Sequence, residues 1–298
     1  MLKHLRDIPL PAHRSGGFDH ADVHLESGRV FVAHTANGTI DVIDGEKLRH
    51  EKTIEGCPEA SGVLCAQKEG LIFAAARGAG KILTIDAMSQ TLLRESQVGT
   101  KPNGLAWDSK RKHLLVADVS DENARLLDPS NGHVLSTRKL EGRPRWCVYD
   151  AAGDRFLINI RDPATVDVLK ADTLEQTASI PVKTPGPHGL AIDEMGHAYV
   201  ACDGKKLVVL DLTGRSEQIG IPIAGEPDVI WYNMKRQLVY CAAGDPGIVE
   251  VIDIHSNKIV ERLETEAGAH TFAFDQIKQR MYTLLPNSCR AGVYEEVS

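Results

Sequence analysis

The sequence lacks the features that would direct it to a membrane, to nucleic acid or into a disulfide framework. No apolar run among its 298 residues approaches the ~20 residues that a membrane helix needs. The amino-terminal segment MLKHLRDIPLP has no apolar core of the kind found in a signal peptide. Lysine and arginine form no blocks, and the formal net charge of −7 is spread along the chain. We therefore expect neither a membrane nor a nucleic acid as partner.

Six cysteines occur in this long chain without the spacing of a metal-binding motif, so we expect reduced, mostly buried thiols and a cytoplasmic location. A Cys202–Cys241 disulfide is the less favoured alternative. The sequence also has no serine-centred nucleophile elbow, no phosphate-binding glycine loop, no zinc-protease helix and no CxxC pair.

Helical heptads are absent, whereas glycine (26 residues) and proline (14 residues) recur at intervals, as expected for short strands joined by turns. The chain also repeats itself with a period close to 42 residues. One set of equivalent positions, which we call the start residues, opens each predicted innermost strand: Asp19, Ser61, Asn103, Arg145, His188, Asp228 and His270. A second set ends each predicted third strand: Asp44, Asp86, Asp128, Lys170, Asp211, Asp253 and Glu295.

Each repeat reads as four strands. In the third copy these are 103–108, 113–118, 124–128 and 133–140, separated by turn residues. A unit of about 40–45 residues with four strands is typical of a β-propeller blade. We therefore predict an all-β fold: one seven-bladed β-propeller domain, residues 1–298, with four antiparallel strands per blade.

The last copy supplies three strands, and the opening segment resembles the fourth strand of the other copies. We expect residues 2–10 to complete the last blade with residues 268–298, which removes two exposed sheet edges and closes the ring.

Several segments resemble known propeller families. FVAHT (31–35) followed by GTIDVID (38–44) resembles the YVTN-type repeat. KPNGLAWD (101–108) and GPHGLAID (186–193) are similar to segments of gluconolactonase-like and strictosidine-synthase-like proteins and of virginiamycin B lyase. The last of these is the nearer resemblance because that family has seven blades, and it implies a divalent-metal enzyme that acts by elimination.

The start residues and the residues that end the second strands should meet at one mouth of the central channel, where propellers commonly bind ligands. The second-strand positions are His34, Arg77, Asp118 and Asp203, with Arg161 close to its equivalent.

Neighbouring blades supply the candidate metal ligands His188, His270, Asp228 and Asp19. Two imidazoles and two carboxylates suit a divalent ion such as Zn, Mn, Fe, Co or Ni. Blades 2, 3 and 4, on the other side of the ring, offer ligands for a small anionic molecule: Arg145, Asn103, Arg77 and Arg161. His34 and His20 are candidate proton carriers.

We hypothesise a metal-dependent lyase or hydrolase acting on a small anion. Two alternatives stay open. The same polar ring also suits a non-catalytic propeller that binds a small molecule or a protein partner, or a mouth that is merely solvated. A register shift of one residue would bring His20 to the channel in place of Asp19. The sequence does not indicate the metal, the substrate or the oligomeric state.

Overall fold

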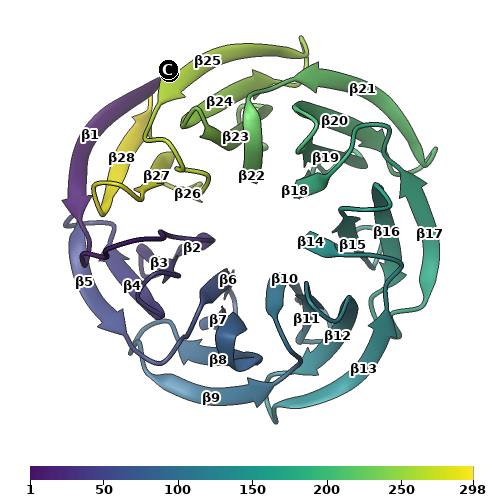
Figure 1. The fold of residues 1–298 in the computed structure, drawn as a ribbon, viewed down its shortest axis with the longest axis horizontal. Coiled ribbons are helices and arrows are strands. Elements are labelled where there is room, and N and C mark those ends of the chain that lie inside the picture. Colours follow the sequence, from purple (N-terminus) through teal and green to yellow (C-terminus); the bar gives the residue numbers. More distant parts are fainter. Residues whose placement is uncertain (298) are drawn as a thin grey trace.

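The chain forms seven four-stranded antiparallel sheets, arranged as a ring around a central channel (Figure 1). This architecture is seen in a computed structural model that describes residues 1–297. Among these residues the one helical element is a short 3-10 turn, η1 (Arg77–Ala79). The predicted seven-bladed β-propeller is confirmed.

Each blade places its strands in chain order from the channel outward, except that the last blade takes its outermost strand from the amino terminus. Blade 1 contains β2 (Ala21–His24), β3 (Arg29–His34), β4 (Thr39–Asp44) and β5 (Arg49–Ile54). Blade 2 contains β6 (Ala60–Ala66), β7 (Leu71–Ala76), β8 (Lys81–Asp86) and β9 (Leu92–Gln97). Blade 3 contains β10 (Pro102–Asp108), β11 (His113–Asp118), β12 (Asn123–Asp128) and β13 (His133–Lys139). Blade 4 contains β14 (Pro144–Asp150), β15 (Arg155–Ile160), β16 (Thr165–Lys170) and β17 (Gln176–Pro181).

The remaining blades follow the same order. Blade 5 contains β18 (Pro187–Ile192), β19 (His197–Cys202), β20 (Lys206–Asp211) and β21 (Ser216–Pro222). Blade 6 contains β22 (Gly225–Asn233), β23 (Leu238–Asp245), β24 (Ile248–Asp253) and β25 (Lys258–Glu264). Blade 7 contains β26 (Phe272–Asp275), β27 (Arg280–Leu285), β28 (Arg290–Glu296) and β1 (Leu2–Pro9).

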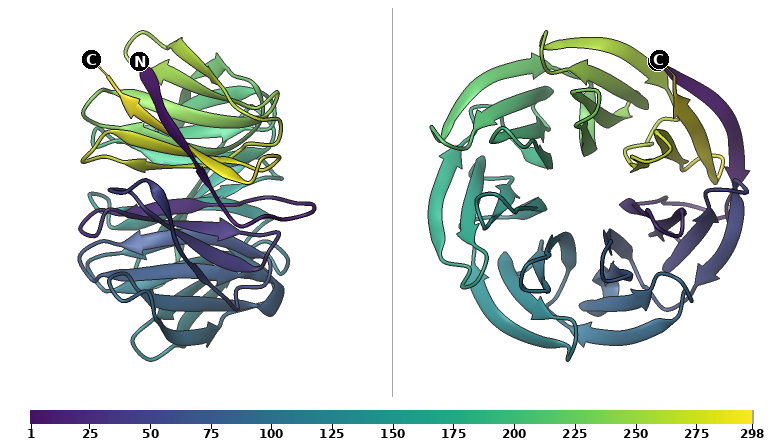
Figure 2. Two further views of the ribbon diagram at one scale, coloured as in Figure 1. Left: turned by 90° about the vertical axis from the view of Figure 1, so that its left-hand side faces the viewer. Right: turned by 180° about the vertical axis from the view of Figure 1, so that it is seen from behind.

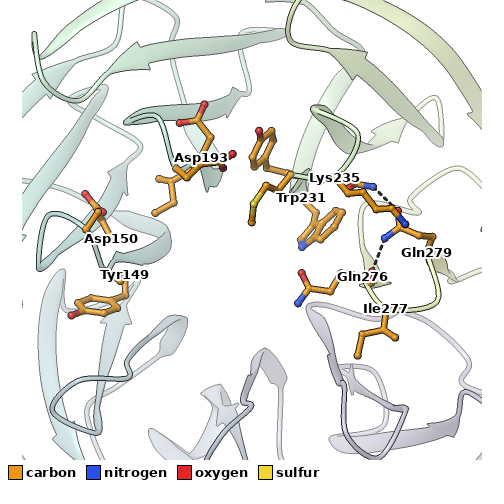
Figure 3. A pocket seen from close by; sticks show the side chains of 15 residues that line it. Tyr149, Asp150, Asp193, Trp231, Lys235, Gln276, Ile277 and Gln279 are labelled. Carbon is orange, nitrogen blue, oxygen red and sulfur yellow. Dashed lines mark hydrogen bonds between the residues drawn. The ribbon is translucent and has the colours of Figure 1, made fainter.

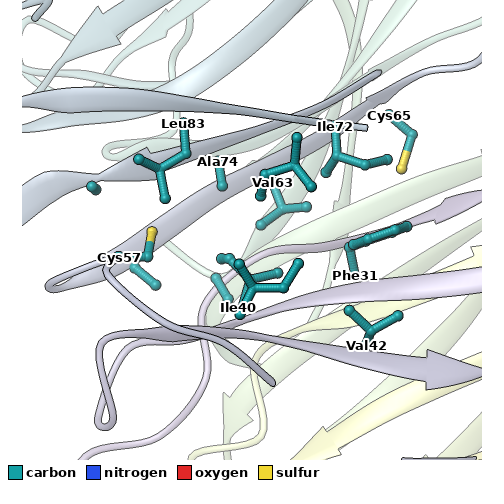
Figure 4. Packing of buried hydrophobic residues seen from close by; sticks show 14 of the residues in the cluster. Phe31, Ile40, Val42, Cys57, Val63, Cys65, Ile72, Ala74 and Leu83 are labelled. Atoms are coloured by element: carbon teal, nitrogen blue, oxygen red, sulfur yellow. The ribbon is translucent and has the colours of Figure 1, made fainter. Parts of the chain in front are cut away.

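The hydrophobic core lies between neighbouring blades. The second and third strands of a blade are buried on both faces, because another blade packs against each face, so they read as nearly continuous apolar runs. Between blades 1 and 2, for example, Phe31 and Ile40 pack with Val63 and Ile72 (Figure 4). The outermost strands have solvent on one side, and their residues are largely exposed.

Glycine after a start residue lets the next blade come close to the axis. A Cβ atom at Gly104 would lie 2.4 Å from the carbonyl oxygen of Arg145, and one at Gly189 would lie 2.1 Å from that of Asp228. Any side chain at these positions would push the neighbouring start residue away. The small residues of the innermost strands therefore help to bring the start residues together.

The second set of repeated positions has a local cause. At the end of its strand, Asp86 accepts backbone N–H bonds from the residues two and three positions later, and Asp211 and Asp253 do the same. Such bonds stabilise the turn that leads to the outermost strand. This periodicity is turn chemistry and carries no information about function.

The amino-terminal strand closes the ring as predicted. β1 pairs antiparallel with β28, from Leu2 opposite Glu296 to Pro9 opposite Arg290. Ile8 of β1 is 1% exposed and belongs to the core between blades 7 and 1. The two ends of the chain consequently lie side by side at the rim (Figure 2). Within residues 1–297, none of the helical structure has the length and apolarity that crossing a membrane requires.

Candidate functional site at the channel mouth

A pocket of about 370 Å³ opens at the end of the channel where the innermost strands begin. Its lining includes the side chains Arg145, Arg161, His188, Asp203, Asp228 and His270. These come from blades 4 to 7, so the ring brings together residues that are far apart in sequence.

Asp228 is the centre of this cluster. The Nε2 atom of His188 lies 3.2 Å from one of its carboxylate oxygens, and the Nε2 atom of His270 lies 3.7 Å from the other. Burial acts to raise the pKa of Asp228, but surrounding cationic groups outweigh this effect and hold the pKa at about 2. Those groups are His188, His20, His270 and Arg145.

The outer nitrogens of both imidazoles are fixed by neighbours. Nδ1 of His188 lies 3.0 Å from a carboxylate oxygen of Asp203, and Nδ1 of His270 lies 2.8 Å from the carbonyl oxygen of Gly268. A carbonyl or an ionised carboxylate only accepts, so each Nδ1 carries the proton and donates. Although burial acts to raise it, the pKa of Asp203 is lowered by His188 and Arg161, which keeps that carboxylate ionised. Both Nε2 atoms are therefore presented to Asp228.

Blade 1 brings both Asp19 and His20 to the same point. One ligand atom from each of them and one from Asp228 all lie within 4.8 Å of one another. Nε2 of His20 is 3.5 Å from a carboxylate oxygen of Asp19. The two residues precede β2, which begins at Ala21, and lie in an extended segment that still pairs with Ala33. The sequence predicts either Asp19 or His20 at the channel, whereas the structure brings both to the cluster.

The His20 ring stacks on the Trp146 ring with a centroid distance of 3.9 Å and an interplanar angle of 24°. Blades 1 and 4 lie on opposite sides of the ring (Figure 1), so this stack spans the channel. Farther along the channel is a pocket of about 260 Å³, which Trp231 and Phe274 help to line.

The opposite end of the channel has a different character. There a pocket of about 800 Å³ is lined by residues at the far ends of the innermost strands, including Tyr149, Trp231 and Ile277 (Figure 3). The cluster around Asp228 therefore belongs to one mouth of the channel.

Two arginines contribute positive charge to the pocket. Arg161 pairs with Asp203 at 2.8 Å, opposite the side that holds His188. Nε of Arg145 is buried and has no hydrogen-bond partner among the residues described. Burial, together with the nearby Arg143, lowers the pKa of Arg145, yet a guanidinium stays charged in proteins. An unpaired buried guanidinium N–H is a favourable place for an anionic ligand.

Arg77 and Asn103, two predicted ligand-binding residues, do not line this pocket but extend the set of polar contacts around it. Arg77 lies 3.3 Å from the amide oxygen of Asn103 and 3.6 Å from Asp19. These contacts extend the polar groups of the channel mouth toward blades 2 and 3.

His34 and Asp118 end second strands, and Asp203 directly follows one, but His34 and Asp118 have partners outside the cluster. His34 is fully buried and bonds to Asp41 and His13. Asp118 is fully buried and accepts backbone N–H bonds from Thr100 and Ser120, among others. The structure does not bring His34 to the cluster, and Asp118 has a structural role.

Glu226 also lines the pocket, although it is not one of the residues that the repeat predicts there. It lies in β22, where the pairing register with β23 shifts between Pro227 and Ile230. A signal was present, since the start residues of blades 5 and 6 are only 40 positions apart instead of about 42. β22 is also longer than the other innermost strands, since it begins with Gly225 opposite Asp245, so Glu226 lies within the strand.

Fold and site together define the class: a seven-bladed β-propeller with an acidic and histidine-rich cluster at one channel mouth. No known protein-family profile matches the sequence, and a search of curated protein sequences finds no match. Among solved structures, the chain is similar to one described as Kuenenia stuttgartiensis hydrazine synthase, with a TM-score of 0.85. The similarity covers 96% of this chain and 98% of that chain, at 11% sequence identity. Identity this low shows a shared fold and nothing further about chemistry.

Proposed function

We propose that the mouth cluster is a divalent metal centre of a lyase or hydrolase that acts on a small anionic molecule. Asp19, His20 and Asp228 would form the core of the ligand set, with Nε2 of His188 beside them. Mixed nitrogen and oxygen donors suit Zn, Mn, Fe, Co or Ni.

The orientation of His188 carries this proposal. With its Nδ1 proton donated to Asp203, His188 turns Nε2 toward the ionised Asp228, 3.2 Å away. Two electron-rich atoms at that distance repel each other unless a proton or a metal ion lies near both. A carboxylate that orients a ligating histidine is a recurrent feature of metal sites, which supports the metal over the proton.

The pocket supports the choice of a small anionic substrate. Its volume of about 370 Å³ lies within the range of small-molecule sites. Arg145 and Arg161 would hold a carboxylate or phosphate group. A bound metal supplies electrophilic polarisation of a substrate oxygen or activation of a water.

His270 is better placed for proton transfer than His34 or His20, the proton carriers that the sequence predicts. Its side chain is 35% exposed, and its Nε2 faces the pocket while Nδ1 is held by Gly268.

We rank elimination ahead of hydrolysis, because segments 101–108 and 186–193 resemble those of virginiamycin B lyase.

Metal content tests the proposal most directly. Protein purified without a metal-affinity tag should contain, or take up by titration with Mn²⁺ or Zn²⁺, about one equivalent of metal. His188→Ala and Asp228→Asn should abolish this binding. Asp203→Asn should weaken it by roughly 10–100-fold, the usual effect of losing an orienting carboxylate.

His255→Ala is the matched control, because His255 lies exposed in the turn after β24. A native protein that neither contains nor binds metal would refute the metal centre. Equal loss of binding in the His255 variant would refute the assignment of ligands.

Substrate chemistry needs a second experiment with metal-loaded protein. Small hydroxy acids would report elimination through the absorbance of an unsaturated product, and 4-nitrophenyl phosphate would report hydrolysis. We expect Arg145→Met to reduce turnover or anion binding at least tenfold while metal content stays constant. Binding of the anion without any turnover would favour the non-catalytic alternative.

The cytoplasmic location stays a prediction, which fractionation of cells would test.

A further inference from the structure

A second cluster of reactive side chains lies where the ring closes, and none of its residues lines the channel-mouth pocket. It joins His34 and Asp41 of blade 1 to Cys289, in the turn between β27 and β28 of blade 7. His13, from the segment between β1 and β2, lies between them.

The contacts form a chain of four groups. Nδ1 of His34 lies 2.7 Å from a carboxylate oxygen of Asp41, and both side chains are fully buried. Nε2 of His34 lies 2.8 Å from Nδ1 of His13, and the thiol sulfur of Cys289 lies 3.6 Å from that same Nδ1 atom. Asp41 is held in turn by the Thr53 hydroxyl, which donates to its other oxygen at 2.7 Å.

The order of these groups sets the direction in which a proton can move, from the Cys289 thiol to His13. Asp41 accepts the Nδ1 proton of His34, so Nε2 of His34 is an acceptor. Two imidazole nitrogens 2.8 Å apart must share a proton, and the thiol is the neighbouring group that can give one to Nδ1 of His13. Transfer of the thiol proton to His13 would leave a thiolate beside an imidazolium that His34 and Asp41 stabilise.

Cys289 also differs from the other cysteines. All six are free thiols, and five are buried: Cys57, Cys65, Cys147, Cys202 and Cys241. Burial raises the pKa of each of those five thiols, which keeps them protonated and inert. Cys289 alone is partly exposed.

We propose that Cys289 is a reactive thiol, activated by His13 through the His34–Asp41 pair, and a site of oxidation by hydrogen peroxide. The thiolate sulfur attacks one peroxide oxygen, an S–O bond forms and the O–O bond breaks. The sulfur loses two electrons and becomes a sulfenic acid, while the peroxide is reduced. The leaving hydroxide takes the proton from Nδ1 of His13 and departs as water.

The thiolate content is tested by alkylation of the native protein with iodoacetamide at pH 6.5, with the modified sites identified by mass spectrometry. We expect Cys289 to react first, and roughly tenfold faster than the cysteine of a synthetic peptide PNSCRAG, which is the same local sequence without the fold. His13→Asn should lower the rate about tenfold. Cys289→Ser should remove the labelling.

Asp41→Asn should slow the reaction severalfold, but this buried change can also unfold the blade. The His13 variant keeps the test decisive, because His13 lies in a surface segment. His4→Asn is the matched control, since His4 lies on the outer strand β1 and, within residues 1–297, its side chain bonds to Asp7 alone.

Oxidation itself is followed by treating the protein with hydrogen peroxide and trapping sulfenic acid with dimedone. We expect the adduct at Cys289 and much less of it in His13→Asn. Equal alkylation rates in the native protein, the His13 variant and the peptide would overturn the proposal. So would a dimedone adduct that is insensitive to His13.

Discussion

At the scale of single residues, Asp22 shows how the inner wall of the ring sets the ionisation of a carboxyl group. Asp22 lies in β2 and accepts the backbone N–H of Cys65 in blade 2 at 2.8 Å, so it ties two blades together. Burial raises its pKa from 3.8 to about 6, even though this bond and one from Val23 favour the charged form.

The raised pKa of Asp22 predicts a pH dependence of stability. The folded protein holds the Asp22 proton more tightly than the unfolded chain, so this contribution is complete below about pH 4 and is lost as the pH rises through 6. Relative to Asp22→Asn, the free energy of unfolding of the native protein should fall by about 2–3 kcal/mol between pH 4 and pH 7. Urea unfolding of both proteins at several pH values measures this difference, and parallel curves would contradict it.

The residue scale is also where the sequence stopped being informative about the site. Asp203 and His34 occupy equivalent positions at the ends of second strands, and the repeat therefore predicts equivalent roles. Asp203 bonds to His188 at the mouth, whereas His34 bonds to His13 instead. His13 lies in a segment outside the repeats, so no periodic pattern could reveal this partner.

At the scale of strands and turns, prediction from sequence succeeded because the same physical requirement recurs seven times. In the third copy, the predicted second strand, 113–118, is the strand that forms. Aspartates such as Asp86 and Asp211 mark the turns, and glycines such as Gly104 and Gly189 mark the closest approach of two blades. Blade 6 departs from this regularity in its longer strand β22, which includes Glu226 two positions before the start residue Asp228, and there the repeat gave no guidance.

Closure of the ring by β1 gives a prediction at this scale. Ile8→Ala should cost about 2–4 kcal/mol, because it opens a cavity in the core that joins blades 7 and 1. Leu93→Ala is the control, since Leu93 lies in the outermost strand of blade 2 and is 55% exposed, where truncation should cost under about 0.5 kcal/mol. Chemical denaturation gives both values. Similar values for the two variants would mean that β1 adds little to the stability of the ring.

At the scale of the whole molecule, the ring makes two different clusters out of residues from distant parts of the chain. The channel-mouth cluster gathers side chains from blade 1 and from blades 4 to 7, and the cluster around Cys289 spans the junction of blades 7 and 1. Both clusters contain residues from either side of the β1–β28 pairing, where the ring closes without a covalent bond. Events at either cluster are therefore coupled to the integrity of the whole ring.

The proposed metal would act as a clamp across that junction. Asp19 and His20 belong to blade 1 and Asp228 to blade 6, so one ion bound by all three resists the separation of blades 6, 7 and 1. A ligand that binds only the folded state stabilises it by about 2.7 kcal/mol at a free concentration 100 times its dissociation constant. For a chain of this size the midpoint of thermal unfolding should rise by roughly 5 °C. A chelator should reverse the rise, Asp228→Asn should show none, and His255→Ala should match the native protein. If Asp228→Asn showed the same rise as the native protein, the ion would be bound elsewhere and the channel mouth would not be a metal centre.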